Sequence, residues 1–343
     1  MLGKKLKAVQ FDIGDFSPEK LIQASAVLVG KNKVDSVHGG WSGWGQNVNA
    51  FGRYNVPTFF ADASLSSVEA YRKNPEKNSN IYQMCDTERP LARNVFDTMI
   101  SLPYEYPNKK IAIIVTDDSW GTETGEAMKI RAEEKGWEVA MYEVVPYGVR
   151  EWGSLLTKIR NIKPAWIHLE IVSPPDVTTF FDQFMESPTQ SLINFGYGVM
   201  PPDLVKTIGP KAGGILGDVV CVMPLPQGPN PEANAWLEKF RAKYGNDPLA
   251  AGYLSYVSLK MWAQAVREVG DVKDYDAINA ALAKMTYTGV EGYTWTFDED
   301  HKIPVSKNTP HLTMQIQDGR LVTIYAGDTK YQQNSFQIPG WIK

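Results

Sequence analysis

The sequence is poor in cysteine, lacks a long apolar run and carries no basic excess, and each shortage excludes a class of protein. Its two cysteines cannot form a disulfide scaffold, and no Cys/His spacing typical of zinc is present. No apolar run approaches the roughly 18 residues that a membrane span needs. A net charge of −4 does not favour binding to nucleic acids or anionic membranes. We therefore expect no metal, no cofactor and no nucleic-acid partner.

Catalytic motifs are missing as well. The Walker, GxSxG and HExxH patterns are absent, and the glycine-rich run at residues 39–45 lacks the GxGxxG spacing of a dinucleotide site. The four histidines are scattered along the chain, which favours structural imidazoles over catalytic bases. The acidic run at residues 298–300 lies between two expected strands and is interpreted as a solvated turn.

What is present is a regular alternation of strands and helices. The expected strands are residues 6–11, 34–37, 56–60, 111–115, 138–145, 166–171, 193–197 and 215–223, and the expected helices are 17–30, 46–54, 122–135, 153–161, 177–186, 231–244, 250–269 and 275–285. Hairpin-like strands follow at residues 293–297, 313–317 and 321–325. Such alternation builds parallel sheets with helices on both faces, and 343 residues exceed one ordinary core. We expect an α/β protein with two doubly wound parallel-sheet lobes.

Small polar and aromatic residues gather where the expected strands end. Ligands of parallel sheets bind at the carboxyl ends of the strands. Residues 38–45 and 61–65 follow two such strands and carry hydroxyls, free backbone amides and aromatic rings. Trp120 and Tyr197 lie near later strand-to-helix loops. Together they predict a small-molecule cleft for a ligand with an apolar body.

Four segments share their order and spacing with a known family: LGKKLKAVQFDIGDFSPEKLIQASAVLVGKNKVDSVHGG, YNVPTFFADAS, KKIAIIVTDDSWGTETGEAMK and DPLAAGYLSYVSLKMWAQAV. The chain resembles the periplasmic type I solute-binding proteins of ABC importers, in the branched-chain amino acid, amide and urea group. The resemblance implies a three-segment hinge, with crossings near residues 85–87, 223–228 and 293–296. Lobe one is then residues 1–86 plus 225–294, and lobe two is 87–224 plus 295–343. Cys85 and Cys221 fall beside the first two crossings, so a bridge between them stays open, although two buried thiols are favoured.

The resemblance also implies which residues touch the ligand. Ser42 and Ser64 match hydroxyls that hold a ligand carboxylate, and Trp120 matches an aromatic residue of the second lobe. The full set of predicted ligand contacts is Trp41, Ser42, Asp62, Ala63, Ser64, Trp120, Glu170 and Tyr197.

One departure from the family concerns the ligand ammonium. Amino-acid binders carry an acid in the loop where this chain has Gly196-Tyr197-Gly198. A buried ammonium without a partner is costly, which counts against a standard α-amino acid as the solute. Asp62 or Glu170 could replace that acid, their alternative roles being a helix cap and a domain-interface salt bridge.

A second departure concerns the first lobe's sheet. The family begins with a further strand and helix, and that strand lies in the middle of the sheet. This chain opens at what matches the second strand, and a missing central strand forfeits roughly ten ladder bonds of about 1 kcal/mol each. We favour a missing upstream segment. The alternatives are that another segment or chain fills the gap, or that the flanking strands pair directly.

These inferences combine into one expected function. We expect a non-enzymatic protein that binds a carboxylate- or amide-bearing solute outside the cytoplasm and delivers it to an ABC permease in the membrane. The periplasmic or extracellular location rests on the resemblance, since residues 1–11 contain no apolar signal segment. A monomer is favoured. The alternatives are a ligand-sensing regulator of the same fold and, less favoured, an α/β enzyme acting on carboxylates or amides.

Overall fold

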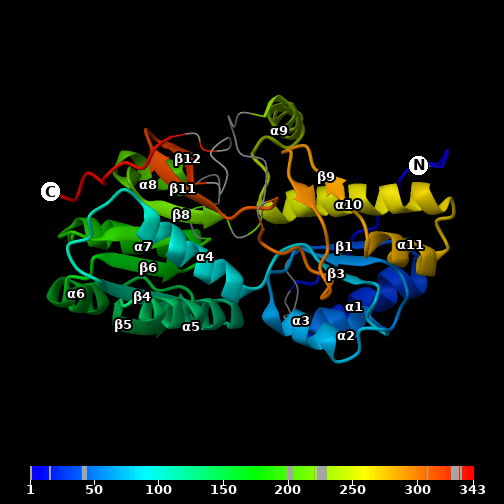
Figure 1. The fold of residues 1–343 in the computed structure, drawn as a ribbon, viewed down its shortest axis with the longest axis horizontal. Coiled ribbons are helices and arrows are strands. Elements are labelled where there is room, and N and C mark those ends of the chain that lie inside the picture. Colours follow the sequence, from blue (N-terminus) through cyan, green and yellow to red (C-terminus); the bar gives the residue numbers. More distant parts are fainter. Residues whose placement is uncertain are drawn as a thin grey trace. The chain divides into compact units, whose positions relative to one another are not determined.

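The computed structural model describes residues 2–14, 17–40, 45–197, 199, 204–219, 221, 230–306, 308–325, 332 and 334–343. The chain forms two compact units, each assembled from separated segments (Figure 1). Unit 1 comprises Met1–Thr87, Cys221–Pro224 and Ala250–Thr309, and unit 2 comprises Glu88–Val220, Leu225–Leu249 and Pro310–Lys343.

Unit 1 is a three-stranded parallel sheet between two layers of helices. The strands, in spatial order, are β1 (Val37–Gly39), β2 (Thr58–Phe60) and β3 (Ile81–Gln83). One face packs against α1 (Pro18–Ser25), the π-helix η1 (Ala26–Lys31), α2 (Gln46–Phe51) and α3 (Leu65–Arg72). The other layer contains α10 (Ala250–Val269) and α11 (Tyr275–Leu282), followed by the short hairpin of β9 (Tyr287–Thr288) and β10 (Thr294–Trp295).

The period of two along each strand divides the side chains of unit 1 between these layers. Val37 and Phe60 join the apolar cluster beneath α1 and α2. His38, Phe59 and Tyr82 occupy matching register positions and point the other way. Their rings stack across the three strands, with centroids 5.0 Å apart for the first pair and 5.1 Å for the second.

The expected strand at residues 6–11 is wrong. Residues 4–14 form no helix or strand, and Leu6 is 55% exposed. Among the described residues, β1 pairs only with β2. An alternating sequence becomes a strand only where a neighbouring backbone completes its hydrogen bonds, and no strand of the described part of the chain pairs with residues 6–11.

Unit 2 contains a seven-stranded mixed sheet. Its strands are β4 (Lys110–Thr116), β5 (Glu138–Val145), β6 (Trp166–Glu170), β7 (Leu192–Phe195), β8 (Leu216–Val219), β11 (Leu312–Gln317) and β12 (Arg320–Tyr325). The spatial order is β12-β11-β8-β7-β6-β4-β5, with β4 to β8 parallel and the β11–β12 hairpin antiparallel.

Helices cover both faces of this sheet. One core cluster joins it to α4 (Glu88–Ser101) and α5 (Ser119–Glu134). A second cluster joins its other face to α6 (Gly153–Ile162), α7 (Pro174–Met185), α8 (Leu204–Ile208) and the 3₁₀ turn η2 (Gly209–Ala212). The unit also includes α9 (Pro231–Tyr244). The expected α/β fold with parallel sheets is confirmed.

The units differ from the expected lobes in three segments and at Thr87. Residues 225–249 belong to unit 2, and residues 221–224 and 295–309 belong to unit 1 together with Thr87, the reverse of the lobes expected from the sequence. Residues 295–309 include Lys302, which forms a parallel bridge with Gln83 of unit 1. Most of the expected linker at residues 224–231 lies outside the described residues.

The two cysteines form a disulfide, so the favoured interpretation of two free thiols is wrong. The Cα atoms of Cys85 and Cys221 lie 5.5 Å apart, and both belong to unit 1. Cys85 follows the end of β3 and Cys221 follows the end of β8. The bond therefore joins two strand-end segments that are 136 residues apart in the sequence.

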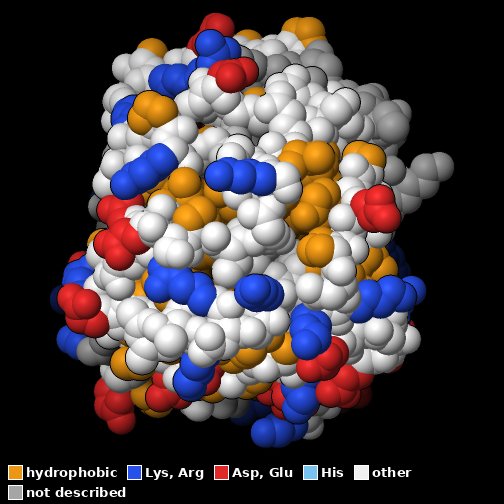
Figure 2. All heavy atoms as spheres, turned by 90° about the vertical axis from the view of Figure 1, so that its left-hand side faces the viewer, with side chains coloured by type: hydrophobic (Ala, Val, Ile, Leu, Met, Phe, Trp, Pro, Cys, Tyr) orange, Lys and Arg blue, Asp and Glu red, His pale blue; other side chains and the backbone are white. Residues whose placement is uncertain are grey.

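Side chains of both charges lie on the surface, as the near balance of acidic and basic residues in the sequence leads us to expect. On the face shown in Figure 2, Lys and Arg side chains are interspersed with Asp and Glu, and hydrophobic side chains gather near its middle. Within the described part of the chain, no helix is long and apolar enough for a membrane span.

Candidate ligand-binding residues

Three of the predicted ligand contacts lie near the carboxyl ends of strands in unit 2. Glu170 ends β6, Tyr197 follows β7, and Trp120 lies in the first turn of α5. The Trp120 Nε1–H donates to Glu170 Oε1 at 2.9 Å. A Cβ added to Gly196 would lie 2.1 Å from Glu170 Oε2, so only glycine leaves room for this carboxylate. The structure thus brings Trp120 and Glu170 together beside the loop that carries Tyr197.

Behind Glu170, buried polar side chains form a row across four strands. We call this set the polar row: Glu170, His168, Asn194, Asp218, His311 and Thr313, each at most 6% exposed. His168 Nε2 lies 3.4 Å from Glu170 Oε2, and its Nδ1 hydrogen-bonds Asn194 Oδ1 at 2.7 Å.

Asp218 joins the far half of the polar row. It accepts from Asn194 Nδ2 at 2.6 Å and from Thr313 Oγ1 at 2.7 Å, and its carboxylate lies 2.7 Å from His311 Nε2. Because polar groups buried in a sheet face are costly unless paired, this continuity explains how the core tolerates them. At the other end of the row, the hydrogen bond to the Glu170 side chain comes from Trp120 Nε1.

Two phenols near these strand ends remain protonated donors at neutral pH. Burial raises the pKa of Tyr197 to about 12. Burial and a hydrogen bond to Asp118 raise the pKa of Tyr147 to about 12, and its hydroxyl donates to Asp118 Oδ2 at 2.7 Å. Asp118 is also the N-cap of α5, accepting from the Gly121 N–H at 2.7 Å.

The predicted contacts of unit 1 follow β2 and are buried. Asp62 accepts from Asn47 Nδ2 at 2.8 Å. Ser64 is the N-cap of α3, where its Oγ accepts from the Ser67 N–H at 3.1 Å. The Ser64 N–H donates to Gln83 Oε1 at 3.3 Å, and Ala63 is 4% exposed. A serine hydroxyl that accepts one N–H can still donate its own hydrogen to a ligand oxygen.

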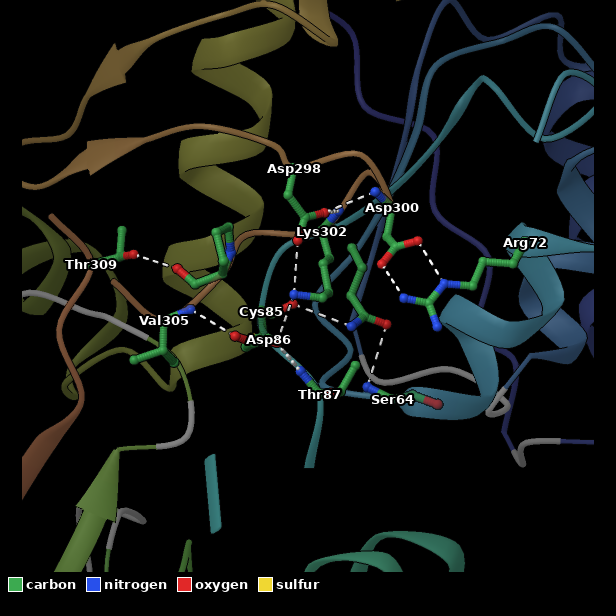
Figure 3. Close-up of polar contacts among 12 residues, drawn as sticks. Ser64, Arg72, Cys85, Asp86, Thr87, Asp298, Asp300, Lys302, Val305 and Thr309 are labelled. Atoms are coloured by element: carbon green, nitrogen blue, oxygen red, sulfur yellow. Dashed lines mark hydrogen bonds and ion pairs between the residues drawn. The ribbon is translucent and has the colours of Figure 1, made fainter. Parts of the chain in front are cut away.

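An ion-pair cluster beside Ser64 holds residues 298–305 to the rest of unit 1 (Figure 3). Lys302 Nζ lies 2.8 Å from Asp86 Oδ1 and 2.9 Å from Asp298 Oδ2. Asp86 Oδ2 also accepts the Val305 N–H at 2.8 Å, and Arg72 binds Asp300 with two hydrogen bonds. The acidic run therefore forms a turn in which the carboxylates of Asp298 and Asp300 bind the protein's own cations and amides.

Sequence reasoning found some of these residues and missed others. Trp41 and Ser42 lie outside the described residues. Asn47 and Gln83, which hold Asp62 and Ser64, were not predicted, nor was the polar row. A usable signal existed, because His168, Asn194 and Asp218 are polar residues inside otherwise apolar strands. Reading them as one row requires the register between strands.

Two α/β units built from discontinuous segments, with polar and aromatic residues at strand ends, define a two-unit binding protein. The chain belongs to the family of periplasmic binding proteins, which matches residues 1–320. The expected family is thus confirmed.

Solved structures share the fold. A protein of Silicibacter pomeroyi, proposed to be a branched-chain amino acid ABC transporter, is 22% identical, with a TM-score of 0.90 over 99% of this chain and 90% of that chain. A branched-chain amino acid transporter substrate-binding protein of Streptococcus pneumoniae, in complex with isoleucine, is 17% identical, with a TM-score of 0.76 over 93% and 86%. An R. palustris solute-binding protein in complex with benzoate is 17% identical, with a TM-score of 0.74 over 99% and 89%.

The match to curated relatives covers only part of each protein. Leu/Ile/Val-binding protein homolog 7 of Brucella abortus is 24% identical over 229 residues, which covers 63% of this chain and 55% of that protein. The matched region therefore spans about half the length of this relative.

Proposed function

We propose that this protein binds a small solute carrying a carboxylate or amide group outside the cytoplasm and passes it to an ABC permease, without catalysing a reaction. Solutes bound by members of the family are delivered to membrane permeases. The observation that carries the proposal is the pairing of Trp120 with a buried Glu170 at the strand ends of unit 2. This pair places the indole of Trp120 beside the carboxylate of Glu170, and the hydrogen bond between them holds the indole in position.

The proposed contacts divide by chemistry. The hydroxyls of Ser42 and Ser64 and the amides near Asp62 and Ala63 bind the carboxylate or carbonyl of the solute. Hydroxyls and backbone N–H groups are good partners for such an oxygen. Trp120 and Tyr197, with Trp41, cover its apolar body.

Two relatives guide the choice of solute. The Streptococcus pneumoniae protein was solved with isoleucine and the R. palustris protein with benzoate. Both ligands carry a carboxylate, and only isoleucine carries an ammonium. The Glu170 carboxylate already accepts the Trp120 N–H and lies near His168. The loop after β7, where amino-acid binders carry an acid for the ligand ammonium, has Gly196 instead. This favours a carboxylate without an α-ammonium.

The proposal is tested in two steps. A thermal-shift screen over aromatic acids, branched-chain amino acids, amides and urea identifies a solute, and calorimetric titration then measures its affinity. We expect Trp120→Ala and Ser42→Ala each to weaken binding by about tenfold, which is about 1.4 kcal/mol. Trp120→Phe keeps an aromatic ring but loses the N–H that donates to Glu170, so its affinity should fall between those of the wild type and Trp120→Ala.

Trp236→Ala is the matched control, since Trp236 is also a partly exposed tryptophan, on α9. It should leave affinity unchanged. Wild-type affinity in both Trp120→Ala and Ser42→Ala would reject the assigned contacts, and turnover of the bound solute would reject a pure binding function.

A further inference from the structure

His168 lies inside the polar row of unit 2, and only one of its two ring nitrogens has a hydrogen bond. The residue is completely buried. Its Nδ1 pairs with Asn194 Oδ1 at 2.7 Å. Its Nε2 lies 3.4 Å from Glu170 Oε2 and has no hydrogen-bond partner in the described part of the chain. Whether this nitrogen carries a hydrogen decides whether it attracts or repels the Glu170 carboxylate.

Asp218 determines which hydrogen the imidazole carries on its other side. Asn194 Nδ2 donates to Asp218 Oδ2 at 2.6 Å, because a carboxylate accepts hydrogen bonds. Asn194 Oδ1 then faces His168 and can only accept, so His168 Nδ1 carries a hydrogen. A neutral imidazole has a hydrogen on one nitrogen only. A neutral His168 would therefore present a bare Nε2 to Glu170.

A bare Nε2 would leave two acceptors facing each other. Glu170 Oε1 accepts the Trp120 N–H at 2.9 Å, and a carboxylate has no hydrogen of its own to donate. Both His168 and Glu170 are buried, and buried polar atoms without partners are costly. A hydrogen on Nε2 removes this cost, because it makes the ring an imidazolium and the 3.4 Å contact an ion pair.

The acids around His168 also favour a cation at this position. Asp218 lies one amide group away, with His311 on its far side. Glu88 is 1% exposed in the first turn of α4, a helix whose core residues pack against this side of the sheet. The described buried residues of α5 are all uncharged. Burial raises the pKa of Tyr197 to about 12, so its phenol is uncharged at neutral pH.

We propose that His168 is a buried imidazolium that neutralises Glu170 and thereby lets unit 2 accept an anionic solute. The inference rests on the proposed function, in which Trp120 and Glu170 lie at the solute site. With the imidazolium in place, the carboxylate of the solute meets a pair with no net charge. Without it, the negative charge of Glu170 is uncompensated and repels the solute carboxylate. His168 is then a residue that determines specificity without touching the solute.

The first test needs no solute. In the one-bond ¹H–¹⁵N spectrum of protein labelled with ¹⁵N-histidine, we expect two ring N–H signals from His168 at pH 7. They are identified by their loss in His168→Gln. A single ring N–H signal from His168 would overturn the proposal. This spectrum reports on the proton even if the proposed solute class is wrong.

The second test compares charged and neutral solutes by calorimetric titration at pH 7. The probes are benzoate with benzamide and isovalerate with isovaleramide, because the members of each pair share an apolar body and differ in charge. His168→Gln keeps an N–H donor near Glu170 but removes the positive charge. We expect it to weaken binding of the acids by about tenfold or more and to change binding of the amides by less than about twofold.

A second substitution tests whether charge is the cause. His168→Gln together with Glu170→Gln removes both charges, so it should restore binding of the acids to near the wild-type affinity. It should also unfold at a higher temperature than His168→Gln alone, which leaves a buried carboxylate without a counterion. His311→Gln is the matched control, since His311 is also a buried histidine beside a carboxylate of the polar row. It should leave the preference between acid and amide unchanged.

Two further results would overturn the proposal. One is an equal loss of acid and amide binding in His168→Gln, which would identify a purely structural role. The other is a double variant that binds the acids no better than His168→Gln does. If the wild type binds neither acid, the proposed solute class is wrong, and the His168 spectrum alone decides whether the imidazolium is present.

Discussion

At the scale of single residues, Asp218 is the junction of the polar row in unit 2. Its carboxylate oxygens lie 2.6 to 2.7 Å from hydrogen-bonding atoms of His311, Thr313 and Asn194, and the residue is only 2% exposed. Truncating one member of such a buried network costs more than its net contribution, because the partners stay buried without bonds. Removing the Asp218 carboxylate should therefore lower the stability of the fold.

Asp218→Ala should lower the free energy of unfolding by about 3 to 5 kcal/mol. Urea denaturation measures the change. Asp182→Ala is the control, because Asp182 pairs with Lys211 at the surface with 46% of its side chain exposed. Exposed ion pairs contribute at most about 1 kcal/mol. Equal effects of the two substitutions would contradict the network.

His38 gives a second prediction, for pH. Burial lowers its pKa from 6.5 to about 3, since the ring lies between Phe59 and Trp262. Its nitrogens hydrogen-bond Ser36 and Ser258. The unfolded chain therefore takes up a proton below pH 6.5 while the folded chain does not until about pH 3.

This difference favours the unfolded state as the pH falls. The stability due to neutral His38 is fully present above pH 6.5 and is lost by roughly 1.4 kcal/mol per pH unit below it, down to about pH 3. His38→Gln should flatten the fall in unfolding free energy between pH 6.5 and 4. Parallel curves for the variant and the wild type in urea titrations at several pH values would show that His38 does not carry this dependence.

At the scale of elements, local signals predicted the long elements well. The ranges of β5, α9 and α10 agree with those expected from the sequence. For α9 the reason is visible, because Asn230 caps the first turn and Gly245 ends the helix with φ of 80°. Ser17 and Pro18 likewise begin α1 as expected.

Elements that depend on partners were harder to predict. The strand expected at residues 34–37 is β1 at Val37–Gly39, because pairing with Thr58–Phe60 sets its register. Residues 6–11 alternate like a strand but lack a paired neighbour. The expectations omitted β3 and α4, and α4 contains Pro90 in its first turn. Tertiary pairing, rather than local pattern, decides such segments.

The sequence likewise predicted some features of the candidate site and missed those that depend on tertiary contacts. The strand-end rule was enough to select Glu170, Tyr197 and Ser64. It could not show that Glu170 is already held by Trp120, or that Ser64 caps α3. These contacts depend on side chains meeting across elements, which spacing alone does not reveal. The ligand contacts themselves stay predictions.

At the scale of the whole molecule, the disulfide joins segments separated by 136 residues in the sequence. Cross-links of long loops stabilise mainly by restricting the unfolded chain. Cys85→Ser together with Cys221→Ser should lower the free energy of unfolding by about 2 to 4 kcal/mol. Urea denaturation without reductant measures the loss.

Adding a thiol reductant to the wild type should reproduce that loss and should leave the double variant unchanged. An unfolding midpoint that is the same in the wild type and the double variant would show that the bond contributes nothing to stability.

The family, the two α/β units and the polar and aromatic strand ends support one central claim: the protein binds a solute through its carboxylate or amide. The most direct measurement is calorimetric titration of the full chain with the best carboxylate from the solute screen and with the methyl ester of the same compound. The account predicts one-to-one binding of the acid and at least tenfold weaker binding of the ester, which keeps the apolar body but loses the anion. Equal affinity for acid and ester, or binding of neither them nor any amide, would contradict it.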